Sequence, residues 1–255
     1  MLFTHTTFIG IDPTAGVRPF VYAALDNELQ LLALGEGKLD DVVAFTAGQR
    51  QAIVAVCAPR QPNQGVMRRD EVRQSLSPQP HPGRWVNFRL AEFQLYQHGI
   101  RIPQTASQAE DCPGWMRMGF MLFNRLAALG YGQYPQEEAE CLSLEVYPYA
   151  CFAVLLGVLP FPKHSLEGRL QRQMALYERD MQVPDPMRFF EEITRYRLLT
   201  SVLPLENIYS SEELDALAAA YTAWLAATQP QGVTLLGDPQ EGQVVLPAAE
   251  LLEKY

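Results

Sequence analysis

Three acidic side chains stand where the sequence predicts that a strand ends or a helix begins. Asp12 ends an apolar run near the N-terminus, Glu145 lies in the predicted strand 140–148, and Asp215 lies in the first turn of the predicted helix 210–228. Ligands of open α/β sheets bind beyond the carboxyl ends of the strands, so two of these acids should face one edge. Carboxylates that converge there repel one another unless a divalent cation neutralises them. Such hard oxygen ligands suit Mg²⁺ or Mn²⁺, and paired metals there could activate water for phosphodiester cleavage.

Each acid also has an explanation that involves no ligand. Asp12 precedes Pro13, and this pair is typical of the start of a turn. Asp215 lies near a helix N-terminus, where the helix dipole favours an acid. Glu145 is harder to explain in this way, because acids are rare in strands and are seldom buried without a partner. The prediction of a catalytic metal site therefore depends on the three acids taken together.

Hydrophobic patterning places these acids in an α/β sheet. The predicted strands lie at 7–11, 18–26, 29–37, 52–59 and 140–148, with a terminal hairpin at 232–237 and 242–247. The predicted helices lie at 39–48, 86–98, 113–129, 149–157, 165–181, 186–202 and 210–228. Three meandering strands followed by alternating helices and strands indicate a sheet of mixed direction.

The whole chain, residues 1–255, is expected to form a single domain with two insertions. A stretch rich in Pro, Gln, Gly and Arg predicts an irregular insertion at about 60–84, and helical periodicity predicts a helical insertion at about 160–205. Hydrophobic residues make up 48% of the chain and no apolar run is long enough to span a bilayer, so no membrane partner is expected. The four cysteines are scattered and the N-terminus has no pattern of a secretion signal, so a cytoplasmic location is expected.

The order of these elements resembles the ribonuclease H-like fold, in which three antiparallel strands precede helix, strand, helix, strand and helix. Short segments are also similar to those that mark the DUF429 family, generally described as predicted nucleases of that fold: GIDPTAG (10–16), VAVCAPR (54–60), LEVYPYA (144–150) and LDALAAAYTAW (214–224). The resemblance covers about residues 8–247. It implies that Asp12, Glu145 and Asp215 are the catalytic and metal-binding residues and that Mg²⁺ or Mn²⁺ is the cofactor.

Cys57 departs from the pattern of that family. Relatives commonly have Asp-Ala-Pro at the end of the fourth strand, where this chain has Cys57, Ala58 and Pro59. If that acid is a ligand, a thiol in its place removes a hard oxygen and disfavours Mg²⁺. The site could then hold one metal, hold a softer metal or be inactive. Alternatively, Cys57 is simply a small buried hydrophobic residue.

The basic residues are unevenly distributed, although the net charge is −9. Seven arginines lie from Arg60 to Arg101, whereas the chain from Glu206 onward has eight acids and one lysine. Arginine makes bidentate contacts to phosphate, so this region is expected to hold the backbone of a nucleic acid or another phosphodiester substrate. A solvated charged face is the alternative interpretation. The substrate-binding candidates are Arg60, Arg84, Arg89, Glu92 and Lys163.

Two of these groups also have local explanations. Arg89 and Glu92 are three residues apart in a predicted helix, which an ordinary side-chain pair would explain. Lys163 and His164 precede Ser165, the expected N-cap of a helix. Cations beside a helix N-terminus favour phosphate binding. His164 is either a structural residue or a proton shuttle.

Three functions fit these observations. The first is a metal-dependent nuclease or related phosphodiesterase of ribonuclease H-like fold. The second is a non-catalytic binding or interaction module, which Cys57 and the acidic balance favour. The third is a phosphotransferase of the actin and sugar-kinase branch, in which a polar loop also follows an acid at the end of the first strand. The chain has no GxGxxG, Walker or GxSxG motif, so dinucleotide, nucleoside-triphosphatase and serine-hydrolase functions have no support.

Overall fold

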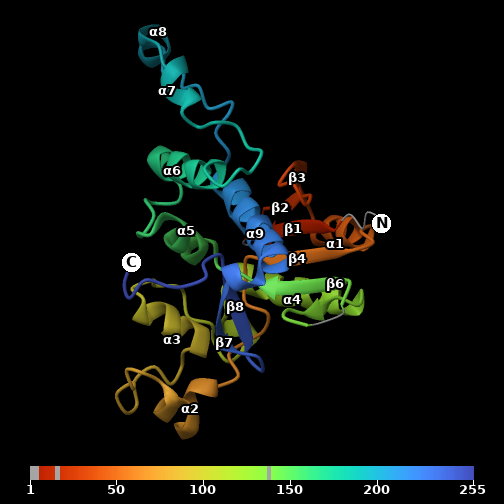
Figure 1. Ribbon diagram of the computed structural model, residues 1–255, viewed down its shortest axis with the longest axis vertical. Coiled ribbons are helices and arrows are strands. Elements are labelled where there is room, and N and C mark those ends of the chain that lie inside the picture. Colours follow the sequence, from red (N-terminus) through yellow and green to blue (C-terminus); the bar gives the residue numbers. More distant parts are fainter. Residues whose placement is uncertain (1–5, 15–17, 137–138) are drawn as a thin grey trace.

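The computed structural model describes residues 6–14, 18–136 and 139–255, and its centre is an eight-stranded mixed sheet (Figure 1). The strands are β1 (Thr7–Asp12), β2 (Phe20–Leu25), β3 (Leu31–Gly37), β4 (Ala52–Val56), β5 (Gly132–Gln133), β6 (Cys141–Glu145), β7 (Thr234–Asp238) and β8 (Gly242–Leu246). Their order is β3-β2-β1-β4-β6-β8-β7, and β5 pairs with β6. β1, β2 and β3 form an antiparallel meander, β4, β6 and β8 run parallel to β1, and β7 is antiparallel to β8.

The structure confirms the predicted mixed α/β class, the meander and the terminal hairpin. The boundaries differ most at the ends of two strands. The strand predicted at 52–59 ends at Val56, and the strand predicted at 140–148 ends at Glu145. In both cases a proline follows closely and cannot donate a hydrogen bond to the sheet ladder. The two-residue strand β5 is too short to leave a pattern in the sequence.

Helices cover both faces of the sheet. They are α1 (Leu39–Ala47), α2 (Asp70–Ser75), α3 (Leu90–Gln97), α4 (Gly114–Ala128), α5 (Pro148–Leu156), α6 (Leu166–Tyr177), α7 (Arg188–Glu192), α8 (Arg195–Leu199) and α9 (Ser211–Thr228), with 3-10 turns at Val66–Arg68, Ala109–Asp111 and Pro230–Gly232. The buried side chains form one cluster between the sheet and α5 and α9, and a second between the sheet and α1 and α4. None of the described helices is both long and apolar enough to cross a membrane.

The two insertions lie at opposite ends of the molecule. α6, α7 and α8 project from one end of the sheet, and α2 lies at the other end (Figure 1). The irregular insertion 60–84 contains a 3-10 turn and α2, so it has more regular structure than predicted. The helix predicted at 186–202 is interrupted at Ile193 and Thr194, which are extended. The hydroxyl of Thr194 accepts a hydrogen bond from the N–H of Arg197 and starts α8 as a new helix.

Gly10 allows α9 to lie directly on β1. A Cβ atom at this position would lie 1.9 Å from the carbonyl oxygen of Ala216 and 2.4 Å from the amide nitrogen of Ala220. The alanines of α9 are themselves fully buried against the sheet. Because glycine faces alanine at this crossing, the helix and strand backbones approach more closely than larger side chains would permit. The end of β1 and the start of α9 are thereby brought together.

Candidate active site

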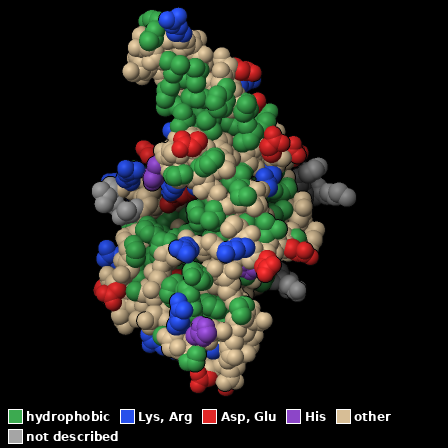
Figure 2. Space-filling view, turned by 90° about the vertical axis from the view of Figure 1, so that its left-hand side faces the viewer, with side chains coloured by type: hydrophobic (Ala, Val, Ile, Leu, Met, Phe, Trp, Pro, Cys, Tyr) green, Lys and Arg blue, Asp and Glu red, His purple; other side chains and the backbone are tan. Residues whose placement is uncertain are grey.

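A cavity of about 610 Å³ opens where β1 and β4 end, and we call it the carboxylate cavity. Asp12, Cys57 and Asp215 line it and are all buried. Figure 2 shows it as a hollow with acidic side chains in its depth and basic and histidine side chains beside it. It joins residues that lie far apart in the chain, as a binding or catalytic site commonly does.

Asp12 is the last residue of β1 and is held by the turn that follows. Its Oδ1 accepts a hydrogen bond from the N–H of Thr14 at 3.0 Å. The hydroxyl of Thr14 in turn donates to the carbonyl of Arg18 at 2.9 Å, which closes the loop. The turn predicted for Asp12 and Pro13 is thus present. It fixes the orientation of the Asp12 carboxylate, so the formation of a turn does not exclude a functional role for this acid.

Asp215 points from α9 towards Asp12 and does not cap its own helix. Ser210 and Glu213 form the capping box, in which Glu213 N–H donates to Ser210 Oγ at 3.2 Å and Ser210 N–H donates to Glu213 at 2.7 Å. Asp215 is the fifth residue of α9, just beyond the first turn where it was predicted. Capping therefore does not explain the acid at this position.

Lys163 lies between the two carboxyl groups. Its Nζ donates to Asp215 Oδ2 at 2.5 Å and lies 3.9 Å from Asp12 Oδ2. It comes from the loop between α5 and α6, so three separate segments meet at this point. Of the predicted substrate-binding residues, Lys163 is the one that lines the carboxylate cavity.

Burial disfavours the charged form of both acids. Burial and then the charge of Asp215 raise the pKa of Asp12 to about 7, against the attraction of Lys163. Burial also raises the pKa of Asp215, although Lys163 opposes it. Burial alone would lower the pKa of Lys163, but Asp215 and Asp12 outweigh it and raise this pKa. In the described residues one ammonium group thus faces two carboxyl groups, which bind and release protons as a pair.

His164 stands at the rim of the cavity in a chain of hydrogen bonds. Ser211 Oγ donates to Glu212 Oε2 at 2.8 Å, and His164 Nδ1 lies 2.9 Å from the same hydroxyl. Since a hydroxyl has only one proton, we assign the proton between them to His164 Nδ1. In the neutral tautomer with this arrangement, Nε2 is the acceptor nitrogen of the ring. The proton-shuttle role predicted for His164 stays a prediction that this geometry permits.

The family model of DUF429, described as a protein family of unknown function, matches residues 10–241. The chain belongs to the DUF429 family. The residues that line the carboxylate cavity, Asp12, Cys57, Lys163 and Asp215 among them, all lie within the matched range. Comparison with curated proteins and with solved structures finds no match.

In this DUF429 chain the structure does not bring Glu145 to the other two acids. Glu145 Oε1 accepts from Arg89 Nη1 at 2.6 Å, and its Oε2 accepts from Arg89 Nη2 at 2.9 Å and from the N–H of Arg60 at 3.0 Å. Both side chains of the pair are buried, at 2% and 4% exposure. The predicted third metal ligand is therefore the partner of a buried arginine.

The strand register explains why Glu145 faces away. Ile11 pairs with Val56, and Val56 pairs with Glu145, so these side chains project from the same face of the sheet. Asp12 and Cys57 come one residue later and project from the opposite face, the one that α9 covers. A strand alternates its side chains with a period of two, so a shift of one residue moves an acid out of the site.

Arg89 and Glu92 were predicted to bind substrate, and both are buried and used within the fold. Besides Glu145, Arg89 donates to the carbonyls of Glu241 and Gly242 at 2.9 and 3.0 Å. Glu92 accepts from the N–H of Arg89 at 3.0 Å and from the N–H of Thr105 at 2.8 Å. These contacts leave no face of either side chain for a substrate. The three-residue spacing reflects the start of α3, where Glu92 caps the backbone.

Arg60 and Arg84 have different surroundings. Arg60 Nη2 donates to the carbonyl and hydroxyl of Ser143 at 3.0 and 2.8 Å, and its guanidinium lies 4.4 Å from the ring centre of Phe123. It therefore stabilises β6 and α4. Arg84 is exposed and its guanidinium lies 5.7 Å from the ring centre of Trp85, outside the carboxylate cavity.

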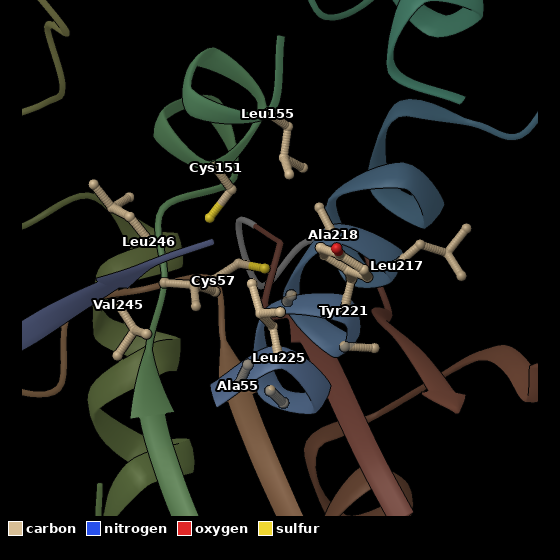
Figure 3. Close-up of a cluster of buried hydrophobic side chains, with 14 of the residues drawn as sticks. Ala55, Cys57, Cys151, Leu155, Leu217, Ala218, Tyr221, Leu225, Val245 and Leu246 are labelled. Atoms are coloured by element: carbon tan, nitrogen blue, oxygen red, sulfur yellow. The ribbon is translucent and has the colours of Figure 1, made fainter. Parts of the chain in front are cut away.

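Cys57 lines the carboxylate cavity, whereas Glu145, which was predicted to lie there, does not. Its Sγ lies 3.6 Å from the carbonyl oxygen of Asp215, and Figure 3 shows it among buried hydrophobic side chains with Cys151 nearby. Burial first, and then the charges of Asp12 and Asp215, raise the pKa of Cys57 well above its ordinary value. Without a metal ion the thiol therefore stays protonated, and a soft metal would have to displace its proton in order to bind.

The remaining donors suit a hard divalent cation. Among the described residues no group of three His, Cys, Asp or Glu side chains is placed to hold a metal ion. Mg²⁺, however, is commonly held by one or two carboxylates, with water and substrate oxygens completing its shell. Asp12 and Asp215 provide such a pair, and their pKa values are raised chiefly by burial, which a bound cation would oppose. These two residues are thus the candidate ligands.

Sequence reasoning missed several residues of the cavity. Arg18, Arg172, Glu212, Tyr147 and Tyr149 also line it. Tyr147 and Tyr149 belong to the segment LEVYPYA, which the sequence did single out, but for Glu145. The sequence alone held no signal that separated them from Glu145, because the register of β6 with β4 decides which face Glu145 occupies.

Proposed function

We propose that the chain is a metal-dependent nuclease or related phosphodiesterase in which Asp12 and Asp215 hold Mg²⁺ or Mn²⁺. The observation that supports this is the meeting of two buried carboxyl groups, from the end of β1 and from α9, in one cavity with a single lysine between them. The part of the strand order that reads β3-β2-β1-β4-β6 also agrees with a ribonuclease H-like fold, and β8 and β7 extend the sheet beyond it. The four free cysteines suit a cytoplasmic location.

The residues of the cavity have distinct roles in this proposal. A bound divalent cation would polarise the phosphoryl group and favour the activation of water. Asp12 and Asp215 bind the cation, and the N–H of Thr14 fixes the orientation of Asp12. Lys163 neutralises Asp215 in the absence of the cation and offers its ammonium to a substrate phosphate when the cation is bound. His164 Nε2 accepts a proton at the rim.

Metal binding tests the proposal directly. Titration of Mn²⁺, followed by electron paramagnetic resonance or calorimetry, should show binding to the wild-type chain and at least a tenfold weaker affinity for Asp12→Asn and Asp215→Asn, because each loses a charged ligand. Asp40→Asn is the matched control, since this exposed acid makes only a 3.7 Å contact to Arg125. Lys163→Met should raise the affinity for Mn²⁺, because it removes the ammonium group that competes with the metal ion for Asp215.

Cleavage of labelled single-stranded and hybrid nucleic acid tests the activity. We expect Mn²⁺-dependent cleavage by the wild-type chain and by Asp40→Asn, and loss of cleavage in Asp12→Asn. Cleavage that is unchanged in Asp12→Asn would contradict the assignment of the site, as would Mn²⁺ affinity that is equal in all three Asp→Asn variants.

A second candidate is a binding module without catalysis. The hydrogen bond of Lys163 to Asp215 favours it, because this lysine already provides a cation where a metal would otherwise be needed. Retained binding of nucleic acid or another partner by Asp12→Asn, together with no cleavage by the wild-type chain, would support this candidate.

A further inference from the structure

A second and larger cavity lies beside the carboxylate cavity, and we call it the aromatic cavity. Its volume is about 1210 Å³, and it is bounded by residues 77–85, by α3 and by residues 253–255. The aromatic side chains in its wall, apart from the histidines, are Trp85, Phe93, Tyr96, Tyr149 and Tyr255. The basic or histidine side chains in its wall are His81, His98, Arg101 and Lys254.

The rings form a cluster that remains partly open to solvent. The ring centre of Trp85 lies 4.2 Å from that of Tyr96, 4.8 Å from that of Phe88 and 5.7 Å from that of Phe93. Tyr96 is 38% exposed, which is high for a large aromatic residue in such a cluster. Ring contacts of this kind hold the cluster rigid and leave one ring available to a ligand.

Cationic groups accompany these rings. The guanidinium of Arg84 lies 5.7 Å from the ring centre of Trp85, and that of Arg101 lies 5.8 Å from the ring centre of Tyr96. Two of the four arginine–ring contacts in the described residues therefore lie at this cavity. Proteins that bind single-stranded nucleic acid combine the same two elements, because bases stack on rings and phosphates contact cations.

The backbone at Trp85 is strained. Its φ angle is +67°, in the left-handed region that a bulky residue rarely adopts. Such a conformation costs free energy and persists only where the surrounding contacts maintain it. Here three aromatic neighbours hold the indole in the wall of the cavity.

Tyr149 connects the two cavities. It lies in the first turn of α5 and lines both of them. Two features lie on the same face of the molecule (Figure 2). One is the hollow that contains the acidic side chains, and the other, below it, is an apolar region with basic and histidine side chains. One extended ligand can therefore reach the carboxylates and the aromatic cluster without passing around the molecule.

We infer that the aromatic cavity binds unpaired bases of a single-stranded nucleic acid whose backbone continues into the carboxylate cavity. This inference rests on the proposed function for the nature of the ligand. A base stacks on the exposed ring of Tyr96, and Arg84, Arg101 and Lys254 contact the phosphates that flank it. A duplex cannot make these contacts, because its bases are stacked on one another and its base pairs do not enter the cavity.

Binding in the absence of metal tests the inference apart from catalysis. Fluorescence anisotropy with labelled oligo(dT) and oligo(U) of about ten nucleotides, in the presence of a chelator, should give roughly tenfold weaker affinity for Tyr96→Ala and for Arg101→Met than for the wild-type chain. Tyr177→Ala is the matched control, because this tyrosine of α6 is 39% exposed and lies outside both cavities. Folding of each variant is checked by circular dichroism.

A single-tryptophan reporter shows where the ligand binds. The chain has three tryptophans, so Trp115→Phe with Trp224→Phe leaves Trp85 alone. Its fluorescence should be quenched by the single strand and not by the matching duplex. Equal affinity of Tyr96→Ala and Tyr177→Ala, or no quenching of Trp85, would overturn the inference. Failure of the proposed nuclease function is seen separately, in the Mn²⁺ titration and the cleavage assay of Asp12→Asn.

Discussion

Single residues in the carboxylate cavity determine how it responds to pH. The protonation of Asp12 dominates this pH response, because burial and the charge of Asp215 raise the pKa of Asp12 from 3.8 to about 7. A protonated carboxyl group is a poor ligand, so protons compete with a metal ion below that pH. Lys163 remains charged throughout this range, since its pKa is raised.

We expect the affinity for Mn²⁺ to rise as the pH is raised through about 7 and to level off above it. Titration calorimetry in a series of buffers measures this profile. Glu92→Gln is the control, because the pKa of Glu92 is also raised to about 7 but this acid lies outside the cavity. A profile without a rise near neutral pH in the wild-type chain would contradict the environment derived for Asp12.

The same shift has a consequence for stability in the absence of metal. A carboxyl group whose pKa is higher in the folded chain stabilises the fold at low pH and loses this contribution as the pH rises. Asp12 loses this stabilising contribution as the pH rises from about 4 to about 7. Glu92 loses its contribution over nearly the same pH range. Unfolding by urea at several pH values should thus show stability falling over this range, less steeply in Asp12→Asn and in Glu92→Gln.

At the scale of elements, the site depends on how closely α9 approaches β1. Gly10→Ala places a Cβ where the backbone of α9 already lies, and relief of this overlap should cost about 1–3 kcal/mol of stability. It should also weaken Mn²⁺ binding, because the helix that carries Asp215 must move away from Asp12. Gly48→Ala is the control, since its φ is −74° and its nearest neighbour would be 3.5 Å away. Urea unfolding of both variants measures the difference, and equal stability would contradict the role of Gly10.

The elements also show what the sequence could and could not predict. The strands and helices that hold Asp12 and Asp215 were predictable, because each has a strong hydrophobic pattern and a clear stop or cap. The pattern did not show which side of β6 Glu145 faces, since that depends on its register with β4. It could not show either that Arg89 would be the partner of Glu145, because these residues are 56 positions apart in the chain.

At the scale of the whole molecule, the arginines between Arg60 and Arg101 are not one surface patch. Arg73 donates to the carbonyls of Arg84 and His81, and Arg60 and Arg89 bind β6 from within the fold. Arg68, Arg69, Arg84 and Arg101 are exposed, and of these Arg84 and Arg101 accompany the rings of the aromatic cavity. Three of the seven arginines are thus used within the fold, and the role of this region in substrate binding stays a prediction.

The projecting end of the molecule makes a separate prediction about stability. In α8, Tyr196 and Leu199 are each 76% exposed, so they contribute little to the core of the described chain. Replacing both with Gln, a good helix former, should change the free energy of unfolding by no more than about 0.5 kcal/mol and should raise solubility. Leu176→Gln in α6 is the matched control, because Leu176 is fully buried and the change would bury an amide without a partner. Thermal unfolding compares them, and a large loss of stability in the α8 variant would show that this segment is covered in solution.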